Sequence, residues 1–322
     1  MTIDSYSSPR LRPPGRFPGM ARLWETRRVW IIGYLFILPW LISLVIFDVI
    51  PFFTNLYLSL TDYSVGPVAS AQWVGLAKYQ EMFQDQLFWK SLGNTAVYLV
   101  MSVPLILLVA LAIALLLSTE IRAVGLFRTL YYIPSVIPVV AGTIIFLWML
   151  NTRFGVVNQL LLVIGLQPVR WLSSPDWVKP AMVLVSLWGF GAQMIIFLAA
   201  LQDIPEQLYE SVAIDGGGLW QRLRYVTIPL MTPTILFNLL VGIINGFQVF
   251  TTAYIMLGSG GGPLQSGLFY MMHIYNNAFR YFNMSYSAAL SFMLFIIILV
   301  FTIVMLRTSN RWVFYGDEAE AA

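Results

Sequence analysis

The stretch 105-LILLVALAIALLL-117 is apolar at every one of its thirteen positions, and it decides the fold class. A helix needs about 20 apolar residues to cross the roughly 30 Å of hydrocarbon in a bilayer, and this stretch with its flanks reaches that length. A membrane β-strand would alternate apolar and polar residues, which this stretch does not do. Because backbone groups in lipid must be paired within the segment, we expect an all-α, polytopic membrane protein.

The composition of the whole chain agrees with this class. The 322 residues are 59% hydrophobic and only 10% charged, with a mean hydropathy of +0.77, whereas a soluble domain carries about 25% charged residues. The net charge of +3 is small and does not indicate a nucleic-acid partner. The chain has no cysteine, which excludes disulfides, thiolate metal sites and a cysteine nucleophile.

Six apolar runs predict six transmembrane helices. Their expected ranges are 29–53, 95–117, 130–150, 181–201, 233–257 and 288–306. The chain then divides into a basic tail at 1–28, a transmembrane domain at 29–306 and a C-terminal tail at 307–322. The segment 75–94, which lies between spans, has the pattern of an interfacial helix. The segment 155–166 fits either an amphipathic helix at the interface or a re-entrant helix.

The distribution of Lys and Arg predicts the orientation in the membrane. The two tails and the segments on their side of the membrane hold twelve of these residues, and the opposite segments hold six over a longer total length. Since cytoplasmic segments carry the excess of positive charge, we expect both termini on the cytoplasmic side.

One charged segment interrupts the apolar pattern on that side, 206-EQLYESVAIDGGGLWQRLRYVTIPL-230. Asp203, Pro205 and Glu206 form a helix N-terminal signal, with Asp203 as the expected cap. Three glycines beginning at Gly216 are expected to end this helix at about residue 215.

A second short helix is expected at 219–226, after which Pro229 and Pro233 stop it and begin the fifth span. The segment fits either a loop lying on the lipid surface or a docking surface for a soluble partner. Acidic and basic residues alternate around its tight turn, which suits anionic lipid poorly and favours docking.

This segment also carries a family resemblance. The pattern 210-ESVAIDG-216, followed after nine residues by 226-VTIP-229, resembles the EAA loop of permease subunits of binding-protein-dependent ABC importers. Glu210, Gly216 and Pro229 match that pattern, whereas Ser211 and Val212 stand where the family has two alanines. The resemblance covers nearly the whole chain and is greatest to the maltose-type sugar permeases. The other stretches that carry it are 53-FTNLYLSLTDY-63, 73-WVGLAKYQ-80, 92-LGNTAVY-98, 126-LFRTLYYIPSVIP-138, 201-LQDIPEQLYE-210 and 258-GSGGGP-263.

The resemblance implies a type I ABC importer permease in a prokaryotic cytoplasmic membrane. It implies three partners: a second, similar permease, a cytoplasmic ATPase dimer and an extracytoplasmic sugar-binding protein. ATP and Mg would bind to the ATPase, so we expect no cofactor, metal or catalytic residue on this chain. The chain has no G-x-x-x-x-G-K-[ST] motif of its own.

The resemblance further implies that the helix at 205–215 docks into a cleft of the ATPase. The coupling loop then comprises 203–229. Its candidate coupling residues are Glu206, Tyr209, Glu210, Ala213, Asp215, Gly216, Arg222 and Pro229.

Polar residues inside the fourth and fifth spans mark the expected path of the solute, because polar groups in membrane helices usually face a cavity or the bundle interior. Amides suit sugar hydroxyls, since they both donate and accept hydrogen bonds. An aromatic ring can cover the apolar face of a sugar. The alternative is that the amides only join helices and the glycines allow close packing; the resemblance to maltose-type permeases favours a site. The candidates are Trp188, Gly189, Gln193, Asn245, Gly246, Gln248, Val249 and Tyr254.

Other functions stay open at this stage. A permease of the same architecture could carry glycerol phosphate, a polyol or an oligopeptide, although a phosphate ester favours Lys or Arg in the cavity and the expected spans hold neither. A membrane enzyme or an ion-driven transporter would need acidic or histidine residues converging within the spans, and these are almost absent. The single histidine, His273, is expected to be structural, without a partner of the kind that a triad or metal site needs. The run 259-SGGGP-263 lacks the lysine of a phosphate loop and is expected to form an outer turn.

Overall fold

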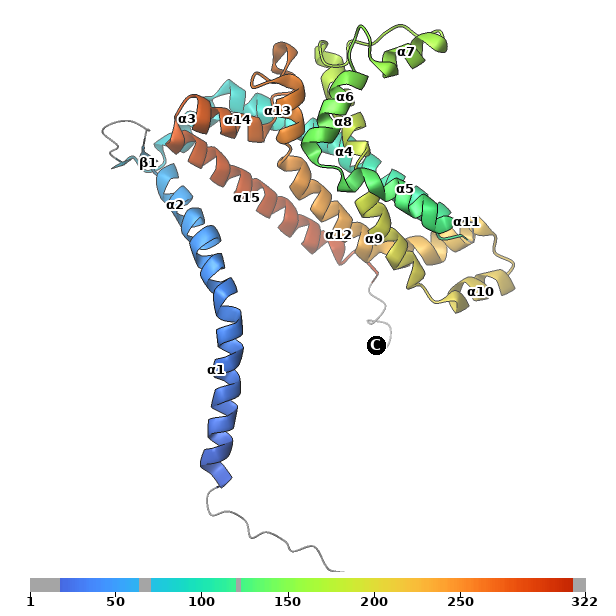
Figure 1. The fold of residues 1–322 in the computed structure, drawn as a ribbon, viewed down its shortest axis with the longest axis horizontal. Coiled ribbons are helices and arrows are strands. Elements are labelled where there is room, and N and C mark those ends of the chain that lie inside the picture. Colours follow the sequence, from blue (N-terminus) through green and yellow to red (C-terminus); the bar gives the residue numbers. More distant parts are fainter. Residues whose placement is uncertain (1–17, 64–70, 120–122, 315–322) are drawn as a thin grey trace, which may run out of the picture. The chain divides into compact units, whose positions relative to one another are not determined.

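The computed structural model describes residues 18–63, 71–119 and 123–314, with side chains from residue 30 onward (Figure 1). It divides into two compact units, Met1–Thr54 and Asn55–Ala322. The first unit contains α1 (Pro18–Leu44), the π-helical turn η1 (Val45–Val49) and the start of α2 (Ile50–Ser59). Within this run, Trp30–Ser59 is long and apolar enough to cross a bilayer. Residues 1–17 of the tail predicted at 1–28, and residues 315–322 of the tail predicted at 307–322, lie outside the described residues.

The second unit is helical apart from a two-residue hairpin, β1 (Thr61–Asp62) with β2 (Gln72–Trp73), in which Thr61 pairs with Trp73. Its helices through the fourth span are α3 (Ala77–Gln84), α4 (Gln86–Leu117), α5 (Val124–Val136), α6 (Val139–Met149), α7 (Val156–Val163), α8 (Pro175–Leu187) and α9 (Gly191–Gln202). The helices that follow are α10 (Glu206–Ile214), α11 (Leu219–Arg222), η2 (Leu223–Thr227), α12 (Ile228–Phe247), α13 (Thr251–Leu257), η3 (Pro263–Gln265), α14 (Tyr270–Tyr275), η4 (Asn276–Arg280) and α15 (Met284–Ser309).

The predicted all-α class with six spans is confirmed. In the part of the chain that the structure describes, four helices are individually long and apolar enough to cross a membrane, and two bent helix pairs complete six. The pair α5–α6 bends by 95° and the pair α8–α9 by 50°. The sharper bend falls at Pro138, which has no N–H to donate and forces the preceding Ile137 into an extended conformation with ψ of 132°.

The expected start of the fifth span is wrong. Residues 219–247 form one continuous helix, so the short helix expected at 219–226 is the beginning of this span. The π turn η2 ends at Thr227, two residues before Pro229, whose fixed φ suits an early helical position. Pro233 leaves the carbonyl oxygen of Pro229 without its helical donor, and the Thr232 hydroxyl replaces that donor at 2.6 Å. The prolines therefore do not stop the helix.

The interfacial helix expected at 75–94 is also corrected. The structure has a separate helix, α3, which ends at Gln84, while residues 86–94 are the first turns of the span α4. Asp85 separates the two helices and caps α4, because its Oδ1 accepts a hydrogen bond from the backbone N–H of Leu87 at 2.8 Å. At 155–166 the expected helix is present as α7.

The core of the second unit lies around α4, which packs against α8, α9, α12 and α14, while α12 and α15 lie side by side (Figure 1). Two glycines let helices approach closely. A Cβ on Gly246 of α12 would lie 2.2 Å from Leu99 of α4, and a Cβ on Gly191 of α9 would lie 2.3 Å from the carbonyl oxygen of Tyr131 in α5. Small residues at such contacts are typical of membrane helix pairs.

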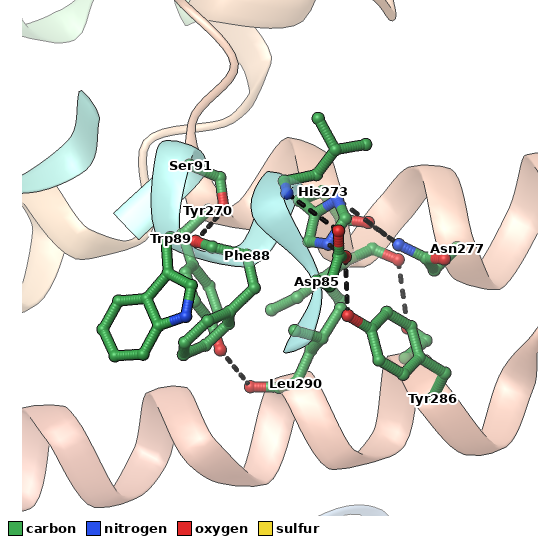
Figure 2. A network of polar contacts seen from close by, with 12 residues as sticks. Asp85, Phe88, Trp89, Ser91, Tyr270, His273, Asn277, Tyr286 and Leu290 are labelled. Atoms are coloured by element: carbon green, nitrogen blue, oxygen red, sulfur yellow. Dashed lines mark hydrogen bonds and ion pairs between the residues drawn. The ribbon is translucent and has the colours of Figure 1, made fainter. Parts of the chain in front are cut away.

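A polar network ties α4, α14 and α15 together, and Figure 2 shows Asp85 at its centre. The second carboxylate oxygen of Asp85 accepts hydrogen bonds from the hydroxyl of Tyr286 at 2.7 Å and from Nε2 of His273 at 3.2 Å. Nδ1 of His273 faces the amide of Asn277 at 3.4 Å. His273 therefore has a carboxylate partner that the sequence analysis did not expect, but no nucleophilic side chain faces it among the described residues.

Candidate functional site

Three breaks in the membrane helices surround one hollow. They lie at 137–138, 188–190 and 248–250, where α5 passes to α6, α8 to α9 and α12 to α13. A cavity of about 280 Å³ is walled by residues at all three breaks and by α4. Its lining residues are Tyr98, Pro134, Ser135, Ile137, Val139, Gly142, Thr143, Phe146, Met182, Val185, Ser186, Trp188, Gly189, Ala192, Val249 and Thr252.

A second hollow of about 150 Å³ adjoins the first, and the two share Tyr98 and Val249 in their walls. Three amide side chains line it, those of Gln193, Asn238 and Asn245. Oε1 of Gln193 is buried and accepts no hydrogen bond from the described residues. A buried acceptor without a donor costs about 1–3 kcal/mol, so this oxygen needs a water molecule or a ligand hydroxyl.

The two hollows are uncharged, and their walls are mostly apolar, with hydroxyl and amide groups set among the apolar side chains. No Asp, Glu, Lys, Arg or His is among the residues that line them. The indole of Trp188 stands at the break between α8 and α9, 45% exposed, with its ring edge-to-face against Phe146 at a centroid distance of 5.5 Å. Hydroxyls, amides and one accessible aromatic face form a surface that can bind a neutral polyhydroxylated molecule.

The charged segment after α9 forms the predicted helix and glycine turn, and the turn leads directly into the continuous helix at 219–247. Gly216 ends α10 with φ of +77°, a conformation that costs a residue with a Cβ about 1 kcal/mol or more. The backbone N–H of Gly217 closes the turn on the carbonyl oxygen of Val212 at 2.8 Å. The hydroxyl pair Tyr209–Thr227, 3.1 Å apart, joins α10 to η2. The glycine turn is thus closed by a backbone hydrogen bond, and α10 is joined to the helix that follows the turn.

The predicted helix cap of this segment is wrong. The residue that precedes α10 is Pro205, and no side chain caps the helix. Asp203 instead ends α9 in a helical conformation, with φ of −81°, so its carboxylate belongs to the preceding helix.

Comparison with known proteins identifies the chain. Residues 88–313 match the family described as the binding-protein-dependent transport system inner membrane component. The chain belongs to this family. The match covers every span after the first and includes the glycine turn at 216–218, so the resemblance carried by the EAA loop is confirmed.

Individual relatives and solved structures agree. The permease is 37% identical to a probable ABC transporter permease protein of Bacillus subtilis, over 89% of this chain and 93% of the relative. It is 35% identical to a lactose transport system permease protein of Rhizobium radiobacter, over 83% and 90% of the two chains. A similar chain is found in the crystal structure of a bacterial alginate ABC transporter in complex with an alginate pentasaccharide-bound periplasmic protein. The two chains superpose with a TM-score of 0.78 and are 25% identical, and the match covers 90% of this permease and 98% of that chain. The type I permease fold is therefore shown.

The structure brings most of the predicted path residues to the two hollows. Trp188, Gly189 and Val249 line the first hollow. Gln193, Asn245, Gly246 and again Val249 line the second. Two candidates lie elsewhere, because the break after α12 turns them away. Gln248 is exposed at the break, and the ring of Tyr254 packs between those of Phe250 and Tyr275.

The candidate coupling residues lie on α10, on its turn, at the end of α11 and at the start of α12. Glu206, Glu210, Ala213, Asp215 and Gly216 are exposed, while Tyr209, Arg222 and Pro229 are half-buried where α10 and α11 face the membrane helices.

Sequence reasoning missed Tyr98, which stands in the wall between the two hollows. It is 6% exposed, and its hydroxyl lies beside those of Ser102 and Ser186. The signal was available in the sequence, because Tyr98 and Ser102 are four residues apart and share one face of an otherwise apolar helix. It was overlooked because the search was limited to the fourth and fifth spans.

Proposed function

We propose that this permease forms the path by which a neutral sugar or oligosaccharide crosses the membrane, as one subunit of a binding-protein-dependent ABC importer. The observation that carries the proposal is the two-part hollow, lined by amides, hydroxyls and Trp188 but by no charged side chain. Relatives named as lactose and as trehalose/maltose transport permeases support a carbohydrate. The acidic polysaccharide alginate, carried by a structural relative, would favour cations in the path, and these hollows have none.

Transport is driven by a separate ATPase dimer, which binds ATP and Mg, and α10 with its glycine turn is the docking segment. Glu206, Glu210 and Asp215 support this role. They are exposed, and none of them forms an ion pair within the described part of the chain, so they are free to meet basic groups of the ATPase. A second, similar permease and an extracytoplasmic binding protein complete the assembly. Both termini and the docking segment then face the cytoplasm.

Uptake of labelled sugars tests the proposed path. Cells expressing the permease with the subunits encoded beside it are supplied with lactose, trehalose or an acidic oligosaccharide. We expect uptake of a neutral sugar and an at least tenfold loss with Gln193→Leu, since one lost hydrogen bond to an otherwise unpaired buried amide corresponds to about 1.4 kcal/mol. Gln202→Leu, at the other end of α9 and outside both hollows, is the matched control. Preferred uptake of the acidic sugar would contradict the proposal.

Co-purification tests the docking segment. The detergent-solubilised permease, co-expressed with its neighbours, should retain an ATPase, and Glu210→Lys should lose it. Asp176→Lys reverses an exposed charge at the start of α8, away from the segment, and should retain the ATPase. Retention by both variants, or no ATPase with the wild type, would remove the support for docking.

A further inference from the structure

A hollow of about 460 Å³ lies between the docking segment and the adjoining ends of α4 and α9. Its lining residues are Leu115, Ser118, Thr119, Leu201, Tyr209, Leu219, Arg222, Leu223 and Thr227. It is separate from the two hollows of the sugar path, with which it shares no lining residue. We propose that this hollow binds a phosphate group and that the guanidinium of Arg222 holds it.

The state of Arg222 is the first argument. Its Nε is buried and forms no hydrogen bond with any described residue. It also forms no ion pair among those residues, although the same segment carries three carboxylates. A guanidinium is always charged, and a buried N–H without an acceptor is unfavourable, so this N–H is suited to bind an anionic acceptor.

The walls of the hollow give the second argument. None of the described residues that line it is acidic. Its hydroxyls are already engaged: Ser118 donates to the carbonyl oxygen of Leu115 at 2.8 Å, and Tyr209 and Thr227 pair with each other at 3.1 Å. Arg222 is therefore the donor left over, and its planar fork matches two oxygens of a phosphate.

The position of the hollow gives the third argument. It lies where α4 and α9 leave the membrane, beside the apolar side chains of Leu115 and Leu201. Because the apolar spans end here, we place the lipid headgroups, which carry phosphate directly above the acyl chains, at this level. The same phosphate chemistry could come from free phosphate in solution, and the two sources are separable by experiment.

A bound phosphate would bridge the docking segment to the ends of α4 and α9. The order of the segment that receives the ATPase would then depend on the occupant of the hollow. This regulation acts on the permease itself, and its test requires neither a sugar nor the ATPase.

The test uses the purified full-length permease in an uncharged, phosphate-free detergent. Phosphatidylglycerol, diacylglycerol with the same acyl chains, or inorganic phosphate is titrated, and the melting temperature and the lipids retained in native mass spectrometry are measured. Arg222→Gln removes the charge, and Arg224→Gln removes an exposed charge two residues further on as the matched control.

We expect phosphatidylglycerol or inorganic phosphate to raise the melting temperature of the wild type and of Arg224→Gln. The concentration needed should rise about tenfold or more for Arg222→Gln, as the loss of a charge-assisted hydrogen bond predicts. An effect of the lipid without one of inorganic phosphate identifies a headgroup, and the reverse identifies a free anion. Equal titrations of Arg222→Gln and the wild type, or an equal effect of diacylglycerol, would overturn the proposal. If Arg222→Gln does not fold, Arg222→Lys replaces it. Binding weakened several-fold by Arg222→Lys supports phosphate binding by the planar guanidinium, and unchanged binding refutes that role of the guanidinium.

Discussion

Asp85 is the residue on which three helices depend. One of its oxygens caps α4, and the other accepts from His273 of α14 and Tyr286 of α15 (Figure 2). His273 is 3% exposed, so burial lowers its pKa below the usual value of 6.5, although the neighbouring carboxylate acts in the opposite direction. The neutral imidazole of His273 keeps its proton on Nε2 and donates it in a hydrogen bond to Asp85. The predicted structural role of the histidine agrees with this geometry.

Replacing Asp85 should destabilise the permease strongly. Asp85→Ala removes the cap of α4, worth about 1 kcal/mol, and leaves two buried donors without an acceptor, at about 1–3 kcal/mol each. We expect a clear fall in the melting temperature of the detergent-solubilised protein. Asp176→Ala, an exposed carboxylate at the start of α8, serves as the control and should melt like the wild type.

The lowered pKa of His273 predicts a direction for the effect of pH. The unfolded chain binds a proton more readily than the folded one, so folding stability is fully present above pH 6.5 and falls as the pH drops through the lowered folded pKa. The difference in melting temperature between the wild type and His273→Gln should become smaller as the pH is lowered. If this difference in melting temperature is the same at every pH, protonation of His273 is not linked to folding.

At the scale of the helices, the sequence predicts the number and type of elements well and their interruptions poorly. Long apolar runs such as 105–117 identify spans without ambiguity. Two predictions that involve proline were wrong. Pro138 bends the span predicted at 130–150, and Pro229 and Pro233 do not stop the helix that was expected to end before them. The outcome depends on the tertiary surroundings: Thr232 supplies the hydrogen bond that Pro233 removes, and a π turn precedes Pro229.

Close contact between α5 and α9 gives a prediction at this scale. Gly191→Ala places a Cβ 2.3 Å from the carbonyl oxygen of Tyr131 and 3.0 Å from the Cα of Tyr132, so the two backbones must separate. We expect lower stability and a weakened bend between α8 and α9. Gly125→Ala, on α5 with open space around its Cβ, should leave the melting temperature unchanged or slightly raised. If both variants melt alike, close packing does not account for Gly191.

At the scale of the whole molecule, polar residues in apolar spans identify individual residues of the site. They do not show which of these residues lie together. Gln193 and Asn245 were identified because amides in a membrane helix are conspicuous. Tyr98 shares a face of α4 with Ser102, which the sequence shows, but its contact with the breaks of the other spans appears only in the fold. Gln248 and Tyr254 were included because a straight helix was assumed through residues 248–250, where the chain breaks.

The glycine turn gives a prediction for the assembled importer. Gly216→Asp has space for its side chain, since nothing lies within 4 Å of a Cβ there, but φ of +77° disfavours it. We expect normal membrane levels of the variant with sugar uptake reduced relative to the ATP hydrolysed. The comparison is made with Gly218→Asp, whose φ of −86° is ordinary. Normal uptake by Gly216→Asp would show that the turn is not needed for coupling.

The continuity of Leu219–Phe247 also bears on which changes in length this permease can tolerate. Inserting one residue into a continuous helix rotates everything beyond it by about 100°. An insertion between Pro233 and Asn238 would therefore swing Asn245 and Gly246 away from their hollow, although no side chain had been replaced. An insertion among the exposed glycines before Leu219 would leave that register intact. Related chains that keep the same solute path should thus keep the number of residues in this helix constant.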